Sequence, residues 1–525
     1  MTEPVADSHR AIMRSISGLL LATFFATLST NILATALPTI LPSLHVSVDG
    51  YTWVVTTYIL MLTVSVPVWG KLADLWPKKL VLQAALVLYL AGSLVGGGAT
   101  SAVVLIIGRA VQGVGTGGLA AVGQIVLASL IAPRQRGRYS GYSGAVFALG
   151  TVAGPLAGGL LVATPVLGWR ACFLVAIPFG LLSLYLIQRH LHLPKAVGRT
   201  ASVDLSGAAL LIAASSTVLI WMSLAGNRFG WWSWPTLAAG LVTALLTIAF
   251  VLVEKRAAEP LIRLSLFRNR SVSLAAAASF FSGIVAFAAP LFLAQYFQLG
   301  RGFSAAQSGL ETLPVIAGIF TASWGAGRLV TLTGRMKPFL IFGAVAQLLG
   351  VAGFAWLPDH SSPQGLILPM FVTGLGIGAL QQNVVLFVQN VIPAGDLGSG
   401  SAATQFCRFL GGALGVSVLG ALSAARVTVH VTSGLRAIGR QLPAGMGIPD
   451  LRVLPHMIAA VYERGYTQAF ADLFTALLPF LVVPVVAVLL MRDVSFAEAV
   501  PTVPDHVAPR ETRALPEESG VRSEE

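Results

Sequence analysis

Two arginines, Arg109 and Arg408, lie inside long hydrophobic segments, where an unpaired cation is unexpected. An arginine at the centre of a bilayer costs about 2.5 kcal/mol or more, so it normally faces a partner or a cavity. Arg109 is therefore a candidate counter-charge for a carboxylate, which it would release when a substrate or a proton arrives. The alternative for both residues is a structural role, in which the guanidinium extends along its helix to the membrane surface.

Carboxylates that could bind and release a proton are scarce in the hydrophobic segments. A desolvated carboxylate is the usual proton carrier in such a setting. Two candidates are present, Glu311 near the start of the tenth apolar segment and Asp472 near the start of the fourteenth. Either residue could instead be a hydrated side chain at the membrane surface, and the sequence leaves both readings open.

The same segments carry amide and hydroxyl groups, which need hydrogen-bond partners in lipid and so should face a cavity or another helix. A cavity of amides and aromatic rings with few anions suits neutral, amphipathic or anionic molecules better than strongly cationic ones. The candidates for lining such a pathway are Asn31, Tyr58, Gln112, Gln295, Gln298, Gln381, Gln382 and Asn383.

No catalytic constellation accompanies these groups. The eight histidines lie in loops or tails without metal-ligand spacing, and no GxxxxGK[ST] phosphate-binding motif is present. Cys172 and Cys407 lie in apolar segments far apart in the sequence, so they indicate neither a disulfide framework nor a metal site. We expect neither an enzyme nor a bound metal or cofactor.

The elements that position these residues follow from the composition. The 525-residue chain is 55% hydrophobic and only 10% charged, which a soluble protein could not accommodate. Its net charge of +12 is concentrated in short loops between apolar runs, which indicates membrane topology rather than nucleic-acid binding.

About fourteen apolar runs are long enough to span a bilayer as helices, which predicts an all-α membrane protein. Every lysine falls in a loop on the side of the N-terminus, so we expect both termini in the cytoplasm. One loop on the opposite side, 425–465, holds five arginines against this rule. The predicted spans lie near 15–37, 52–71, 80–98, 103–126, 140–164, 171–188, 205–224, 235–253, 272–297, 308–328, 338–356, 366–391, 401–424 and 467–491.

An internal repeat divides the chain. The second segment ends GKLADLWPKK (70–79) and the tenth GRLVTLTGRMK (327–337), while the fourth holds QGVGTGG (112–118) and the twelfth TGLGIGA (373–379). This order predicts two six-helix bundles with a substrate site between them at the membrane midplane. The predicted parts are a cytoplasmic N-terminus (1–14), the bundles (15–188 and 272–491, the second with the outer loop 425–465), a linker with two extra membrane helices (189–271) and a disordered cytoplasmic tail (492–525).

Two further motifs concern conformation. In the 70–79 turn, Gly70 permits a close helix approach, Lys78 anchors at the headgroups, and Asp74 could pair with Arg138 or lie against a helix N-terminus. In GTVAGPLAGG (150–159), Gly154, Pro155 and Gly158 could form a pivot or a packing seam. The glycines at 113–118 likewise allow close approach of a neighbouring helix or of a bound molecule.

Together these stretches resemble the major facilitator superfamily. GKLADLWPKK is similar to its loop motif after helix two, RAVQGVGTGG (109–118) to its helix-four motif, and GTVAGPLAGG to the helix-five motif typical of exporters. VDLSGAALL (203–211), NRFGWWSWP (227–235), EPLIRLSLFRNR (259–270) and QSGLETLP (307–314) further resemble the fourteen-helix drug:proton antiporter branch. The resemblance implies proton-coupled antiport. That branch usually has an aspartate in helix one, whereas this chain has Ser29 in LSTNILATALP (28–38).

The sequence thus predicts a monomeric multidrug or antibiotic efflux transporter in the cell membrane, with protons, membrane lipids and a small hydrophobic or amphipathic substrate as partners and no role for nucleic acid. The absence of an aspartate at Ser29 and the long outer loop favour an alternative, a transporter of lipids or lipid precursors with weak or no proton coupling. A non-transporting membrane scaffold or sensor is a further alternative, which the buried amides and Arg109 disfavour.

Overall fold

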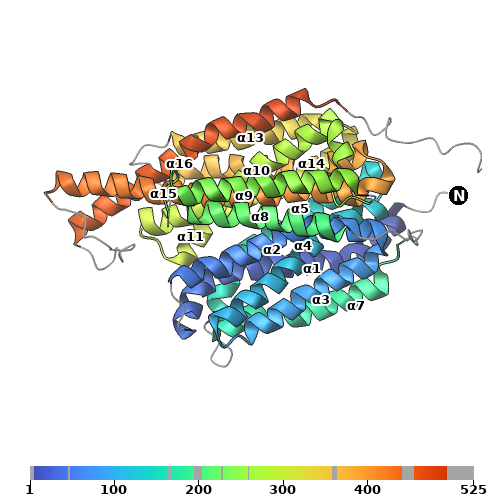
Figure 1. Cartoon of the computed structure of the whole chain (residues 1–525), viewed down its shortest axis with the longest axis horizontal. Helices are drawn as coiled ribbons and strands as arrows, with labels where there is room; N and C mark the ends of the chain where they lie inside the picture. The colour runs from blue at the N-terminus through green and yellow to red at the C-terminus, as the bar shows by residue number, and fades with distance from the viewer. Residues whose placement is uncertain are drawn as a thin grey trace, which may run out of the picture.

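The computed structural model describes residues 5–44, 48–162, 168–193, 204–225, 229–257, 259–356, 363–439 and 455–493. Apart from one isolated bridge between Ala225 and Phe229, the regular structure in these ranges is helical (Figure 1). The α-helices are α1 (Val5–Ser43), α2 (Val48–Leu75), α3 (Lys78–Gly97), α4 (Ala102–Leu130), α5 (Pro133–Val162), α6 (Ala171–Leu174), α7 (Ala176–His190), α8 (Leu205–Leu224), α9 (Trp234–Arg256), α10 (Arg270–Gln295), α11 (Ala305–Glu311), α12 (Leu313–Thr333), α13 (Lys337–Ala355), α14 (Ile367–Val391), α15 (Leu397–Ala437) and α16 (His456–Leu490).

Thirteen helical stretches in the described residues are long and apolar enough to cross a membrane. The remaining long helix is the 30-residue α5, whose sequence is diluted by glycine, serine and three arginines near its start. The predicted all-α membrane fold with about fourteen spans is therefore confirmed.

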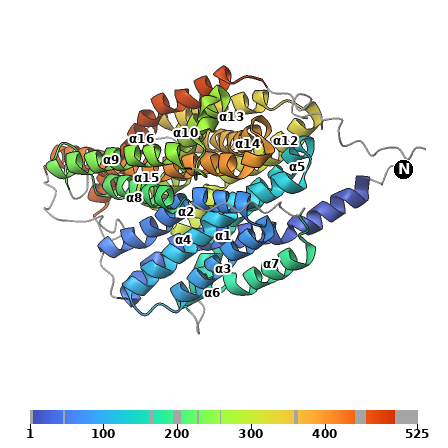
Figure 2. The same cartoon turned by 45° about the vertical axis from the view of Figure 1, so that its right-hand side comes forward.

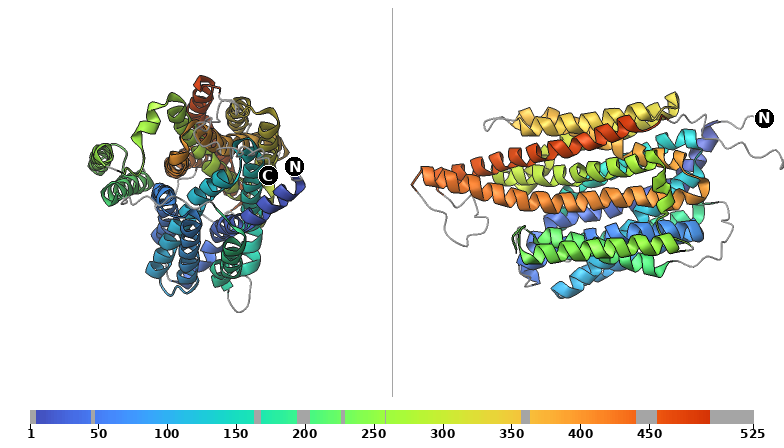
Figure 3. Two further views of the ribbon diagram at one scale, coloured as in Figure 1. Left: turned by 90° about the vertical axis from the view of Figure 1, so that its right-hand side faces the viewer. Right: turned by 45° about the horizontal axis from the view of Figure 1, so that its top comes forward.

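The helices form two bundles that lie one above the other in Figure 1. The N-terminal bundle contains α1 to α7 and the C-terminal bundle α10 to α16, and the same pairs recur in each: α2 and α3 pack on α4 as α12 and α13 pack on α14. Helices α8 and α9 pack on each other at the side, where α8 contacts α2 and α15 (Figure 2; Figure 3, left). The two bundles meet along α2 with α15 and α5 with α12.

The two ends of the bundles differ in charge. Lys71, Lys78, Lys79, Lys255 and Lys337 lie where α2 meets α3, α9 meets α10 and α12 meets α13, and we name this the basic end. The opposite end carries the tips of α15 and α16, which project beyond the other helices (Figure 3, right). We name it the hairpin end.

Two segments predicted as loop or tail are helical. The 41-residue α15 is about 60 Å long, about twice the apolar thickness of a bilayer, and its last turns pack on α16 through Val431, Leu435 and Tyr462. Of the predicted outer loop 425–465, only 438–455 lies between the two helices. Similarly, α1 begins at Val5, within the predicted N-terminal segment 1–14. The predicted tail 492–525 lies outside the described residues beyond Asp493.

Glycines set the distance between helices within each bundle. A methyl group on Gly115 of α4 would overlap the backbone nitrogen of Tyr89 in α3, and one on Gly376 of α14 would overlap that of Gln347 in α13. The glycine-rich stretches of the internal repeat therefore serve helix packing, which was one of the two predicted uses.

Replacing Gly115 with alanine should force α3 away from α4. Because the overlap is with backbone atoms, we expect a loss of about 1–3 kcal/mol in the free energy of unfolding. Thermal denaturation of the purified protein in detergent, followed by tryptophan fluorescence, measures this loss. Gly325→Ala in α12 is the matched control, because nothing lies within 4 Å of the added methyl group. Equal midpoints for both variants would contradict the packing role.

Candidate functional site

Arg109 lies inside the N-terminal bundle and is only 3% exposed. Its Nη1 donates a hydrogen bond to Gln112 Oε1 at 2.6 Å, and Gln112 Nε2 donates to Ser93 Oγ of α3 at 2.9 Å. The guanidinium carbon lies 3.8 Å from the centroid of the Tyr58 ring on α2. A charge inside an apolar bundle must be stabilised by polar groups and ring faces, and here these come from α2, α3 and α4. The contacts of Arg109 therefore join three helices.

No carboxylate of the described residues lies within ion-pair distance of Arg109. The Tyr58 hydroxyl bonds to Thr30 Oγ1 at 2.6 Å, and Ser29 is buried beside Tyr89. In this conformation the cation is enclosed within the N-terminal bundle. The predicted counter-charge role stays a prediction.

Asn31 and the glycine motif of α5 meet at a helix seam. Asn31 Nδ2 donates to the backbone oxygen of Thr27 at 2.8 Å, and a methyl group on Gly154 would overlap the Asn31 side chain. Gly158 is buried in the same helix, and the side chain of Pro155 lies outside the described residues. The geometry places α1 directly against α5 at this point.

Arg408 lies on the side of the C-terminal bundle that faces the N-terminal one. Its Nη1 is 3.4 Å from Gln381 Oε1, its guanidinium carbon is 4.6 Å from the centroid of the Phe409 ring, and its buried Nε has no hydrogen-bond partner in the described residues. One turn earlier, Gln405 Nε2 donates to the backbone oxygen of Ala120 in α4 at 3.4 Å. Arg408 is thus a cation at the junction of the two bundles, and no described residue supplies an anion to it.

Amides extend this junction. Gln389 Nε2 reaches the backbone oxygen of Gln124 at 3.4 Å, and Gln382 lies close to Gly144 of α5. Asn383 instead bonds to the backbone oxygen of Ala379 within its own helix at 2.6 Å. We name the group of side chains between the bundles the polar seam; its members are Gln381, Gln382, Gln389, Gln405 and Arg408.

At the basic end, the Asp74 carboxylate of α2 caps the start of α15. Its Oδ1 accepts from the backbone nitrogen of Gly398 at 3.0 Å and its Oδ2 from that of Ser399 at 2.9 Å. Gly70, one turn earlier, lies directly against Ala402. An anion at a helix N-terminus satisfies free N–H groups and complements the helix dipole. This contact, the Asp74–α15 cap, joins the two bundles.

Arg138 takes no part in the Asp74–α15 cap, whose partners in the described residues are Gly398 and Ser399. Its side chain is exposed, and its backbone nitrogen donates to Thr331 Oγ1 of α12 at 3.1 Å. Of the two partners predicted for Asp74, the structure therefore shows the helix N-terminus. Lys78 is partly exposed at the start of α3, as expected of a headgroup anchor.

The remaining candidates lie toward the hairpin end. Glu311 is partly buried at the end of α11, which packs on α5 of the other bundle, and no described residue forms an ion pair or hydrogen bond with its carboxylate. Asp472 Oδ2 lies 2.9 Å from His430 Nε2 and 3.7 Å from Arg426 Nη1. Gln295 and Gln298 are exposed at the π-helical turn that ends α10.

Sequence reasoning missed a set of ion pairs at the basic end. Lys71 Nζ lies 2.6 Å from Glu259 Oε2, and Arg263 Nη1 lies 2.5 Å from Asp396 Oδ1. The signal was present in EPLIR (259–263), where two opposite charges four residues apart follow a predicted span. Their partners are more than a hundred residues away in the sequence, so only the folded chain identifies them.

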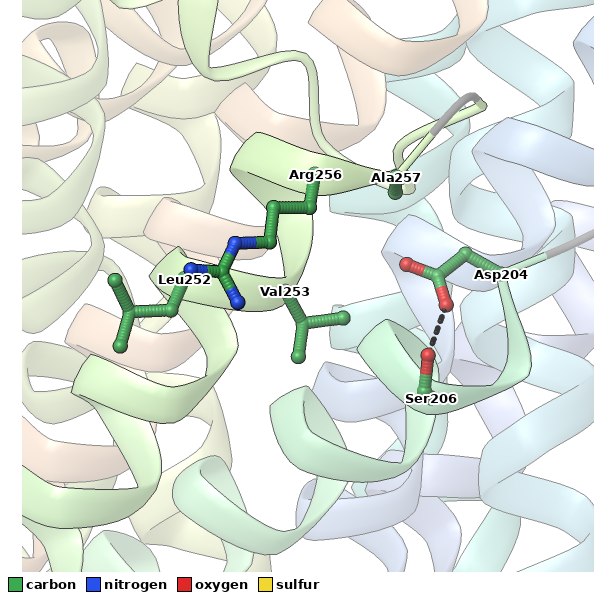
Figure 4. Close-up of a pocket in the computed structure, with 6 residues that line it drawn as sticks. All are labelled: Asp204, Ser206, Leu252, Val253, Arg256 and Ala257. Atoms are coloured by element: carbon green, nitrogen blue, oxygen red, sulfur yellow. Dashed lines mark hydrogen bonds between the residues drawn. The ribbon is translucent and has the colours of Figure 1, made fainter.

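A pocket of about 290 Å³ lies between the basic ends of α8 and α9. Figure 4 shows its polar lining, the Asp204 carboxylate with its hydrogen bond from Ser206 on one side and the Arg256 guanidinium on the other. Because Asp204 also caps α8 by accepting from Gly207 N at 2.9 Å, this pocket is a helix-end feature away from the polar seam.

The model of the Major Facilitator Superfamily matches residues 19–416 of this chain. An uncharacterized MFS-type transporter of Mycobacterium tuberculosis is 33% identical over 473 residues, covering 89% of this chain and 68% of the relative. The multidrug transporter protein MdtP of Bacillus subtilis is 31% identical over 444 residues, covering 85% and 81%. Among solved structures, a proton:xylose symporter superposes with a TM-score of 0.59 at 13% identity, covering 93% of this chain and 98% of that one.

Asp74→Asn should weaken the Asp74–α15 cap, because it removes the charge while retaining one acceptor. A carboxylate at a helix N-terminus contributes up to about 2 kcal/mol, so we expect the bundles to separate about three- to ten-fold more often at the basic end. Maleimide labelling of Ser323→Cys, 2% exposed in the α5–α12 contact, reports that separation in a Cys172→Ser, Cys407→Ser background.

Asp204→Asn is the control for that labelling, since Asp204 caps α8 within one segment rather than between the bundles. If both variants accelerate labelling equally, the Asp74–α15 cap does not govern separation of the bundles.

Proposed function

Because this chain belongs to the major facilitator superfamily and is a multi-pass membrane transporter rather than an enzyme, we propose that it exports hydrophobic or amphipathic drugs and antibiotics by proton-coupled alternating access. Two relatives support the cargo class, because one is named a multidrug transporter and the other an efflux pump. The second is an MFS-type efflux pump of Mycosarcoma maydis, which is 29% identical over 486 residues. The match covers 89% of this chain and 77% of that relative. The internal repeat supports the mechanism, since repeated bundles rock about a site between them.

The observation that carries the proposal is the Asp74–α15 cap. It joins the two bundles at the basic end through two backbone hydrogen bonds to one carboxylate. Such a contact can be lost and re-formed as a unit, so it suits a gate that closes one side of a transporter while the other opens. We place the basic end in the cytoplasm by the positive-inside rule, with both termini there and the protein in the cell membrane.

The polar seam is the proposed substrate site. It combines amides, which can reorient to different partners, with one guanidinium that lacks an anion in the described residues. An exporter with such a site would accept neutral and anionic amphiphiles and reject strongly cationic ones, because a second cation would be repelled. A substrate displacing water from the seam would bridge both bundles, since Gln405 and Gln389 already contact α4.

Glu311 and Asp472 are the proposed proton carriers. Glu311 is the stronger candidate, because α11 contacts α5 of the other bundle and its carboxylate faces no cationic partner among the described residues. Asp472 is bound to His430 and lies near Arg426, so a change in its protonation would act on the hairpin formed by α15 and α16.

A second candidate function is transport of lipids or lipid precursors with weak or no proton coupling. The observation in its favour is the helical hairpin of α15 and α16, which extends beyond the bilayer thickness at the hairpin end. Burial of Ser29 beside Tyr89, at the position where the branch usually has an aspartate, also favours it. The transport assay below distinguishes the two functions. We propose a monomer in either case.

Reconstitution into liposomes with an imposed pH gradient tests proton coupling. Drug and fluorescent lipid cargoes are assayed separately, and we expect Glu311→Gln to reduce gradient-driven drug export at least about ten-fold, as loss of a required proton carrier should. Asp472→Asn is measured in parallel, and Glu463→Gln on the hairpin is the matched control. Full gradient-driven export by both Glu311→Gln and Asp472→Asn would show that neither carboxylate couples transport. Gradient-independent lipid movement would favour the second function.

Arg408→Gln tests the substrate site in the same liposomes. Removing a hydrogen bond to a charged group costs about 1.5–3 kcal/mol, so the KM for an anionic amphiphile should rise about ten-fold or more. We expect a less than about two-fold change for a neutral amphiphile. The control is Arg328→Gln, whose exposed guanidinium stacks over Trp324 at 5.8 Å. An equal loss for both cargoes would place Arg408 outside the substrate site.

A further inference from the structure

The segment Glu259–Arg263, which follows α9, crosses the junction of the two bundles at the basic end. Glu259 Oε2 lies 2.6 Å from Lys71 Nζ on α2, and the Lys71 side chain is only 4% exposed. Lys71 and Asp74 are neighbours on one face of α2, so this ion pair lies beside the Asp74–α15 cap. We name the segment the strap.

The strap also holds the start of α15. Arg263 Nη1 lies 2.5 Å from Asp396 Oδ1, directly before the helix, and Ser399 Oγ donates to the backbone oxygen of Leu261 at 3.3 Å. Ser399 is the same residue whose backbone nitrogen donates to Asp74. One short segment therefore contacts α2 of the N-terminal bundle and α15 of the C-terminal bundle at the point where these helices meet.

The strap is anchored to the accessory helix α9. Glu254, 3% exposed in the last turn of α9, accepts through Oε1 from the backbone nitrogens of Leu261 at 3.1 Å and Ile262 at 3.3 Å. Leu261 is 1% exposed and packs into the core of the N-terminal bundle. The strap is thus an ordered element, held by backbone hydrogen bonds to Glu254 and by the buried side chains of Leu261 and Ile262.

We propose that the strap latches the basic-end gate closed, and that α8 and α9 thereby take part in the conformational cycle. This inference rests on the proposed alternating access and adds a regulatory element to it. When α2 and α15 separate, the strap cannot follow both helices, so the Lys71–Glu259 pair or the Arg263–Asp396 pair must break. Because Lys71 is nearly buried, losing Glu259 would leave an uncompensated charge, which opposes opening.

Spin-label distances across the basic end measure the latch without needing a cargo. Labels are placed at Trp76→Cys, 52% exposed after α2, and at the exposed Thr333→Cys at the end of α12, in the full chain with Cys172→Ser and Cys407→Ser in lipid nanodiscs. Double electron–electron resonance then gives the fraction of molecules with the longer, open distance. We expect Glu259→Gln and Arg263→Gln each to raise that fraction about three- to ten-fold, as partly buried charge pairs do.

Arg268→Gln is the matched control, because Arg268 is an exposed cation of the same linker, and we expect less than about 1.5-fold change. The charge exchange Lys71→Glu with Glu259→Lys should restore the wild-type fraction at least in part, which separates a lost ion pair from a misfolded strap. Unchanged fractions in both Glu259→Gln and Arg263→Gln would overturn the latch while leaving alternating access intact. A single, invariant distance in the wild type at both acidic and neutral pH would overturn both proposals.

Discussion

Two backbone hydrogen bonds to the Asp74 carboxylate hold the bundles together at the basic end, and much of the surrounding structure depends on them. A helix that starts at a bundle junction leaves its first N–H groups without partners, and no water is available where they are buried. Asp74 supplies both acceptors from the other bundle. Gly70 makes the approach possible by giving Ala402 room one turn deeper. The Asp74–α15 cap consists of two hydrogen bonds to a single side chain. Both can therefore break together when α2 and α15 separate.

The two arginines in the membrane-spanning helices lie in different surroundings. Arg109 is enclosed by Tyr58 and Gln112 inside one bundle, where it joins three helices. Arg408 lies between the bundles, where its one hydrogen bond in the described residues, to Gln381, is long. Arg109 is held by a 2.6 Å hydrogen bond and a ring contact at 3.8 Å, whereas the corresponding contacts of Arg408 are longer, at 3.4 and 4.6 Å. The more loosely held guanidinium is the better ligand for an incoming molecule, because less is lost when it changes partners. This difference makes the polar seam, and not the Arg109 cluster, the proposed substrate site.

The two accessory helices connect to the gate in different ways: α8 packs on α2 and α15 through apolar side chains, whereas α9 connects through the ion pairs of the strap. Helix α9 is mostly exposed, as expected of a helix that faces lipid, and its basic end carries the buried carboxylate of Glu254. Glu254 orders the strap, and the strap places Glu259 and Arg263 on opposite bundles. Because each pair is partly shielded from water, its strength depends on both partners being present. The strap therefore links α9 to the gate where the chain re-enters the C-terminal bundle.

The sequence by itself determined the helical membrane fold, the two related bundles and the inserted helix pair. Hydrophobic length, loop charge and repeated glycine patterns act over short distances along the chain, so they can be read without tertiary contacts. The sequence also offered a helix N-terminus as one partner for Asp74, but it could not say which helix. Only the tertiary structure decided that Arg109 is enclosed in one bundle while Arg408 faces the other, and that Lys71 pairs with Glu259. Which residues form ion pairs, and which way a polar side chain points, depend on helix rotation and on neighbours that can lie more than a hundred residues away. No local pattern encodes either.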